Sequence, residues 1–216
     1  MLDGIYEGLG EVPVLSEGLQ AEAITLESTK LELFENKQFL SEVDEVRIKE
    51  TASIMKEVFS EDVLASWSEL TLEEKSAKLN EYYVKAGENL GINTRGVIVE
   101  PMYSEPGTIS FGYNTGDGYI HLNGAVVEDP GTLGQVLETA THEMRHQFQN
   151  DAVANPYRFL DIPANVLGTW QYEFRHYIRP EYDYQGYYEQ TIESDAREFS
   201  EDVLQAYMGK MNLNLN

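Results

Sequence analysis

The chain has 216 residues, enough for one packed domain or for one domain with an extension, and its 42% hydrophobic content is ordinary for a globular protein. It carries 38 acidic and 15 basic residues, and this formal net charge of −23 disfavours binding to nucleic acids or to anionic membrane surfaces. The absence of cysteine excludes disulfides and thiolate metal sites, so a metal ion would have to be held by histidines and carboxylates.

We expect neither a secretion signal nor a membrane span. Residues 1–11 contain no basic segment and no apolar core of signal-peptide length. No apolar run approaches the roughly 20 residues that cross a bilayer. The sequence therefore predicts a soluble protein that is cytoplasmic or is exported without a conventional signal peptide.

Two helices are predicted in the first part of the chain. Apolar residues recur at helical spacing over residues 36–60. A second helix begins at Thr71, because Glu74 three residues later completes a capping box. This helix is expected to end near Gly87 or Gly91.

Short strands are predicted after these helices. Residues 97–99 are apolar and β-branched. Residues 109–113 and 119–123 flank the turn-rich segment 114–118, which is typical of a β-hairpin.

A long helix is predicted to follow, with Asp129 as N-cap and Pro130 at its first position. His142 and His146 lie beside the apolar stripe of this helix and not within it. The stripe consists of Leu133, Val136, Leu137, Ala140, Met144 and Phe148.

The rest of the chain is predicted to be a long connection and a final helix. Residues 155–186 are rich in Pro and Tyr, show no firm period, and are interpreted as a loop. The final helix runs from about Thr191 to Gly209. The expected fold is an α+β domain over residues 61–216 with a mostly helical extension over residues 1–60.

The chemistry-bearing pattern is the H-E-x-x-H motif that begins at His142. Because His142 and His146 are four residues apart on a helix, both imidazoles can bind one Zn²⁺ ion. Glu143 lies at the flank of the same face, where it can deprotonate a metal-bound water.

A catalytic zinc site needs a third protein ligand. The metzincin pattern requires Gly and His at the positions of Gln149 and Ala152, so it is excluded. In glutamate-type zincins the third ligand is a Glu on a second helix, followed three positions later by a small residue. Glu193 with Ala196 fits this pattern, and Asp195 is the alternative. Since Asp195 is about 200° around the helix from Glu193, only one of them can face the metal.

The sequence does not single out one residue that would assist catalysis. His176, Tyr187 and Tyr188 are candidates for donating a hydrogen bond to the transition-state oxyanion. Residues 119–123 are predicted to be an edge strand that pairs with extended substrate. His121 in this strand is interpreted as an ordinary strand residue.

Two segments resemble the zincin-like metallopeptidase domains of bacterial polymorphic toxins and related phage proteins. Residues 141–149, Thr-His-Glu-Met-Arg-His-Gln-Phe-Gln, look like the H-E-x-R-H-x-x-Q signature of these domains. Residues 188–199 look like their Q-x-x-E-x-D-A-x-x-F segment. Residues 67–71 and 90–92 are similar to the lead-in of such domains.

The resemblance implies a zincin-like fold with His142, His146 and Glu193 as zinc ligands and Glu143 as the catalytic base. It implies a protein or peptide substrate and an immunity or inhibitor protein as a further partner. It also implies that three other residues matter, namely Arg145, Gln149 and Asp195.

The function that these observations favour is zinc-dependent hydrolysis of peptide bonds, toxin-type or phage-related. The alternative is a non-enzymatic interaction or structural protein whose zinc site is structural, with four ligands, or vestigial. A third hypothesis is that the two histidines bind no metal.

Overall fold

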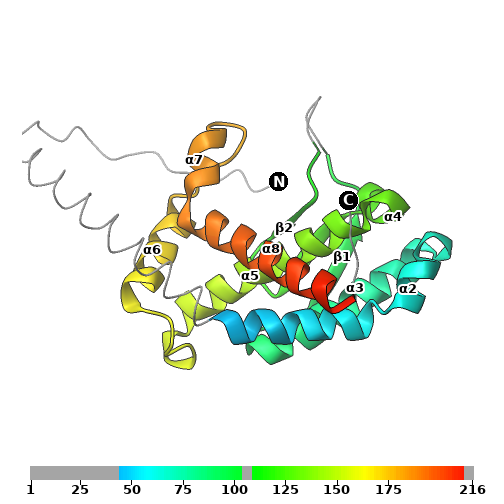
Figure 1. The fold of residues 1–216 in the computed structure, drawn as a ribbon. Coiled ribbons are helices and arrows are strands. Elements are labelled where there is room, and N and C mark those ends of the chain that lie inside the picture. Colours follow the sequence, from blue (N-terminus) through cyan, green and yellow to red (C-terminus); the bar gives the residue numbers. More distant parts are fainter. Residues whose placement is uncertain (1–43, 104–108, 212–216) are drawn as a thin grey trace, which may run out of the picture. The chain divides into compact units, whose positions relative to one another are not determined.

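The structure, a computed structural model, describes residues 44–103 and 109–211. These residues form a mixed α+β fold that is mostly helical and has one three-stranded sheet (Figure 1). The α+β class is as predicted. The labelled helices are α2 (Glu61–Ser66), α3 (Leu72–Leu90), α4 (Gly124–Glu128), α5 (Leu133–Ala154), α6 (Ala164–Arg175), α7 (Tyr184–Glu189) and α8 (Thr191–Met211).

The two predicted N-terminal helices are present within the described residues. The first covers residues 44–58, and Ala52, Met55 and Val58 on it are buried in the same hydrophobic cluster as α3, α5 and α8. Residues 1–43 of the predicted extension lie outside the described residues. Helix α3 has the predicted capping box and ends at Gly91, which adopts the left-handed conformation, φ 71°, that glycine tolerates best.

The sheet has the order β1–β3–β2, with β1 over Gly96–Glu100, β2 over Gly112–Asn114 and β3 over Tyr119–Asn123. Strand β3 is parallel to β1 and antiparallel to β2, so the predicted hairpin is confirmed, although its first strand is shorter than expected. Both edges of β3 are paired. The prediction that residues 119–123 form an edge strand is therefore wrong, and β2, which contacts α5, is an edge strand.

Helices α5 and α8 form the centre of the fold, and α8 lies across α5 in Figure 1. Met144 and Phe148 on α5 and Phe199 and Val203 on α8 are buried in one hydrophobic cluster. This packing fixes the two helices that carry the histidine motif and the predicted third ligand.

The segment 155–186 differs from its prediction as a loop, because it contains α6 and the start of α7. Helix α6 shows no clear period in the sequence since only Val166 and Trp170 on it are buried. The final helix, α8, begins at Thr191 as predicted and ends two residues later than expected.

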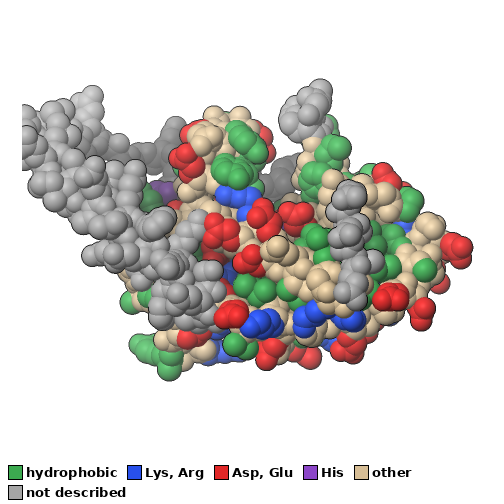
Figure 2. Space-filling view, viewed as in Figure 1, with side chains coloured by type: hydrophobic (Ala, Val, Ile, Leu, Met, Phe, Trp, Pro, Cys, Tyr) green, Lys and Arg blue, Asp and Glu red, His purple; other side chains and the backbone are tan. Residues whose placement is uncertain are grey.

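The surface is acidic, as the composition predicts. Figure 2 shows Asp and Glu side chains spread over the face that contains α8, with a few Lys and Arg among them. Within the described ranges, no helix has both the length and the apolar character needed to span a bilayer.

Candidate metal centre

His142 and His146 lie one turn apart on α5, and their rings converge. The ring centroids are 4.7 Å apart with an interplanar angle of 87°. The two Nε2 atoms are 3.1 Å apart. The i, i+4 spacing therefore brings the Nε2 atoms of the two rings close together.

Helix α8 brings Glu193 close to these two atoms. Its Oε2 lies 3.4 Å from His142 Nε2, and its Oε1 lies 3.4 Å from His146 Nε2. Ala196, one turn further on, is fully buried, in keeping with the close approach of the two helices. His142, His146 and Glu193, whose ligand atoms all lie within 4.8 Å of one another, are called the candidate metal site below.

The three side chains of this site lie close enough together to hold one metal ion. Ligand atoms about 2.05 Å from zinc, at tetrahedral angles, are about 3.3 Å apart. Here the two Nε2 atoms are 3.1 Å apart, and each lies 3.4 Å from a different carboxylate oxygen of Glu193. With one ligand atom from each residue, all three atoms lie within 4.8 Å of one another. In addition, Oε2 of Glu193 is buried without a hydrogen-bond partner, a costly arrangement that a cation would relieve. Two imidazole nitrogens and one carboxylate oxygen are also a donor set that zinc accepts.

The charges of these side chains shift the pKa values of Glu193 and His146 in the direction opposite to that favoured by burial. Burial favours a higher pKa for Glu193, but the imidazoles of His142 and His146 hold the pKa of this carboxyl well below its usual range. Burial likewise favours a lower pKa for His146, but the Glu193 carboxylate raises this pKa to about 9. The three side chains thus hold a proton at neutral pH, and a metal cation that binds there would displace this proton.

Glu143 lies beside the candidate metal site and is not a member of it. It is buried, and its carboxyl interacts electrostatically with all three site residues. Burial raises the pKa of Glu143, and the positive charge of the two imidazoles opposes this increase. A carboxyl with a raised pKa next to a metal site is suited to proton transfer near neutral pH.

Two tyrosines adjoin the third ligand. The hydroxyl of Tyr177 donates a hydrogen bond of 2.7 Å to Glu193 Oε1. The ring of Tyr187 packs edge-on against that of Tyr177, and burial together with the charge of Glu193 raises the pKa of both hydroxyls. Tyr187 is among the donors predicted from the sequence. Tyr177 is not, because it lies in the connection between α6 and α7, where no motif or period singles it out.

The other two predicted donors have partners elsewhere. His176 is exposed, stacks on the ring of Tyr172 and contacts the Tyr172 carbonyl oxygen through Nδ1 at 2.9 Å. The ring of Tyr188 packs against the guanidinium of Arg197 at 3.7 Å. The structure therefore brings Tyr187, but neither of these residues, to Glu193.

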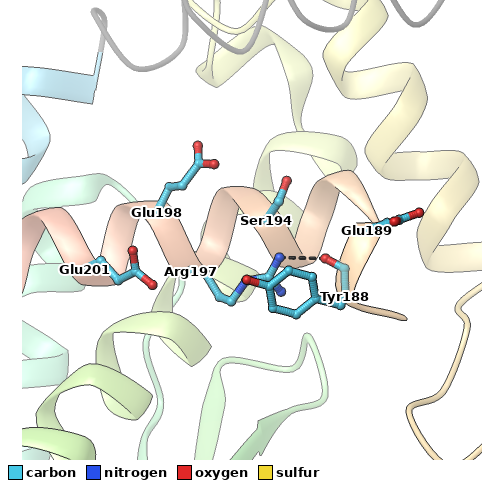
Figure 3. A pocket seen from close by; sticks show the side chains of 6 residues that line it. All are labelled: Tyr188, Glu189, Ser194, Arg197, Glu198 and Glu201. Atoms are coloured by element: carbon cyan, nitrogen blue, oxygen red, sulfur yellow. Dashed lines mark hydrogen bonds between the residues drawn. The ribbon is translucent and has the colours of Figure 1, made fainter. Parts of the chain in front are cut away.

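A pocket of about 350 Å³ lies on an adjoining face of α8 (Figure 3). Its lining residues are Tyr188, Glu189, Ser194, Arg197, Glu198 and Glu201. Arg197 donates a hydrogen bond of 2.6 Å to the carbonyl oxygen of Tyr188 and is thereby drawn to one side of the pocket. His142, His146 and Glu193 do not line this pocket, so the candidate metal site lies outside it.

Asp195 points away from the metal site, as the helical spacing predicts. It forms a bidentate ion pair with Arg145, with Nε to Oδ2 at 2.8 Å and Nη2 to Oδ1 at 2.9 Å. His121 contacts Glu100 through Nδ1 at 2.8 Å and stacks on Tyr113, which agrees with its interpretation as a strand residue.

Comparison with known proteins gives no further guidance. No family model matches the sequence, and neither a curated protein nor a solved structure matches it. The functional argument therefore depends on the residues of the site.

Proposed function

We propose that the protein is a zinc-dependent metallopeptidase with a zincin-like core formed by the sheet, α5 and α8. The observation that carries this proposal is the convergence of His142, His146 and Glu193, whose ligand atoms lie within 4.8 Å of one another, with the buried Glu143 beside them. The two histidines come from the motif helix and the glutamate from the second helix, the arrangement of a glutamate-type zinc site.

The number of ligands favours catalysis over a structural zinc site. Among the described residues, the group contains three potential ligands and no fourth His, Asp or Glu. Structural zinc sites are closed by four protein ligands, whereas catalytic sites leave one position open.

Glu143 performs the proton transfers in the proposed reaction. A bound zinc ion would supply Lewis acidity and lower the pKa of a water molecule to about 7. Glu143 accepts a proton from the attacking water and then donates it to the leaving amine. Burial, by raising the pKa of Glu143, suits it to both steps at neutral pH.

Two further features suit a peptide substrate. Strand β2 contacts α5, and its outer edge pairs with no other strand among the described residues, so an extended peptide can add to it by backbone hydrogen bonds. The Tyr177 hydroxyl, next to the third ligand, is the group best placed to donate to the developing oxyanion.

The test compares the wild-type chain with Glu143→Gln, and with Glu88→Gln as a matched control on the exposed surface of α3. Each protein is analysed for zinc and incubated with an unbiased peptide library, with and without a chelator. We expect hydrolysis by the wild type and by Glu88→Gln, inhibition by the chelator, and no hydrolysis by Glu143→Gln with its zinc retained. Full activity of Glu143→Gln would refute the mechanism. A wild-type protein that binds zinc and cleaves no peptide would support the structural alternative.

A further inference from the structure

The second ring nitrogen of His146 has a defined partner. Nδ1 lies 2.9 Å from Oε1 of Gln149, one turn further along α5. The amide nitrogen of Gln149 donates to the carbonyl oxygen of Ile192 at 2.9 Å and to Oδ2 of Asp195 at 2.7 Å. Both of these partners are acceptors only, so the amide oxygen must face His146. Nδ1 therefore carries a hydrogen, and in the neutral ring Nε2 is the nitrogen whose lone pair is available to a metal ion.

Asp195 is itself held in place. Arg145 binds both of its carboxylate oxygens, and this fully buried guanidinium contacts the rings of Phe148, at 4.6 Å, and Phe199, at 4.7 Å. A bidentate pair whose guanidinium is fully buried against aromatic rings has little freedom to rotate. The orientation of Asp195, and through it that of Gln149, is thereby set by the core.

The same arginine connects this cluster to the helix over residues 44–58. Arg145 Nη2 also donates to Oδ2 of Asp44, which is 4% exposed, and Oδ1 of Asp44 accepts from Arg47 at 2.7 Å. Arg47 pairs in turn with Asp161. Hydrogen bonds thus run without a break from Asp44 to His146, over three helices.

We propose that Asp44, Arg145, Asp195 and Gln149 are positioning residues that orient His146 for the metal ion, so that metal affinity depends on the helix over residues 44–58. This inference rests on the metal-binding part of the proposed function and not on hydrolysis. Partners of this kind fix the tautomer and the ring orientation of a ligating histidine. Asp44 is the member that the sequence motifs do not contain.

The first test compares Gln149→Met with Gln147→Met. Both glutamines are fully buried on α5, but Gln147 bonds to Gly118, Asn114 and Asp151 instead of a candidate ligand. Zinc affinity is measured on the full chain by competition with a chelator. Gln149→Met is expected to bind zinc about 10–100-fold more weakly, with a changed Co²⁺ absorption spectrum. Gln147→Met should lose stability but keep the wild-type affinity and spectrum.

The second test examines the more distant residue and uses a milder change. Asp44→Asn keeps one acceptor and removes the charge, and Asp161→Asn is its control because Asp161 binds Arg47 but not Arg145. We expect Asp44→Asn to weaken zinc binding, by less than Gln149→Met, and Asp161→Asn to leave it unchanged.

Failure of the inference can be told apart from failure of the metal site. If the wild type binds zinc and Gln149→Met binds it equally well, the positioning role is refuted while the site stands. If only Asp44→Asn matches the wild type, the dependence on the helix over residues 44–58 is refuted. A wild type that does not bind zinc overturns both.

Discussion

The protonation of His146 should make zinc binding strongly dependent on pH. A zinc ligand must be a neutral imidazole, and the Glu193 carboxylate outweighs burial to raise the pKa of His146 to about 9. At pH 7 about one molecule in a hundred then has this ring neutral, so zinc must displace about one proton. The apparent affinity should therefore rise about tenfold per pH unit from pH 7 and level off above about 9.

Chelator competition between pH 6.5 and 9.5 measures this dependence, and calorimetry in two buffers of different ionisation enthalpy counts the released proton. Glu193→Gln is the informative variant. It removes the anion that raises the pKa of His146, so its weaker zinc binding should be nearly independent of pH above 7. A wild-type affinity that is flat between pH 7 and 9 would show that the assigned charge state is wrong.

The same pKa values predict the stability of the zinc-free protein. Because the folded pKa of His146 lies above its ordinary value of 6.5, its stabilising contribution is complete below about 6.5 and is lost as the pH rises through about 9. The rise of this pKa from 6.5 to about 9 corresponds to about 3 kcal/mol, since one pKa unit corresponds to about 1.4 kcal/mol. Glu193, whose pKa is lowered, stabilises the fold above its ordinary pKa and loses this effect as the pH falls. Urea unfolding as a function of pH, with zinc removed, measures both changes.

Two further predictions concern single residues. Gly91→Ala should lower the free energy of unfolding by about 1 kcal/mol, because the φ of 71° at this position strains an L side chain. Gly168 is exposed on α6 and has free space around it, so Gly168→Ala should raise the free energy of unfolding by about 0.5–1 kcal/mol. Urea unfolding measures both changes, and two changes of the same sign would contradict this reasoning. Tyr177→Phe should reduce peptide hydrolysis about 100-fold while zinc is retained. Tyr172→Phe, which alters a tyrosine stacked on His176, is the control and should leave hydrolysis unchanged. Equal activities of the two variants would exclude Tyr177 as the oxyanion donor.

The sequence by itself determined the features that depend on short-range spacing. His146 lies four positions after His142, and this spacing places both residues on one face of an α-helix. Thr71 and Glu74 form their capping box within one turn, and Gly91 ends the same helix for a local backbone reason. Glu193 was predicted from its own helical pattern with a small residue one turn later.

Only the tertiary structure decided how these local features meet. Asp44 and Arg145 are 101 positions apart and belong to helices that no short motif pairs, so their ion pair follows from the packing of the core. Tyr177 lies in a segment without period, and α6 shows too few buried residues to be recognised. The order of the sheet, which makes β2 and not β3 the edge next to α5, depends on long-range strand pairing. The sequence thus specifies the candidate ligands, and packing of distant helices determines what orients them.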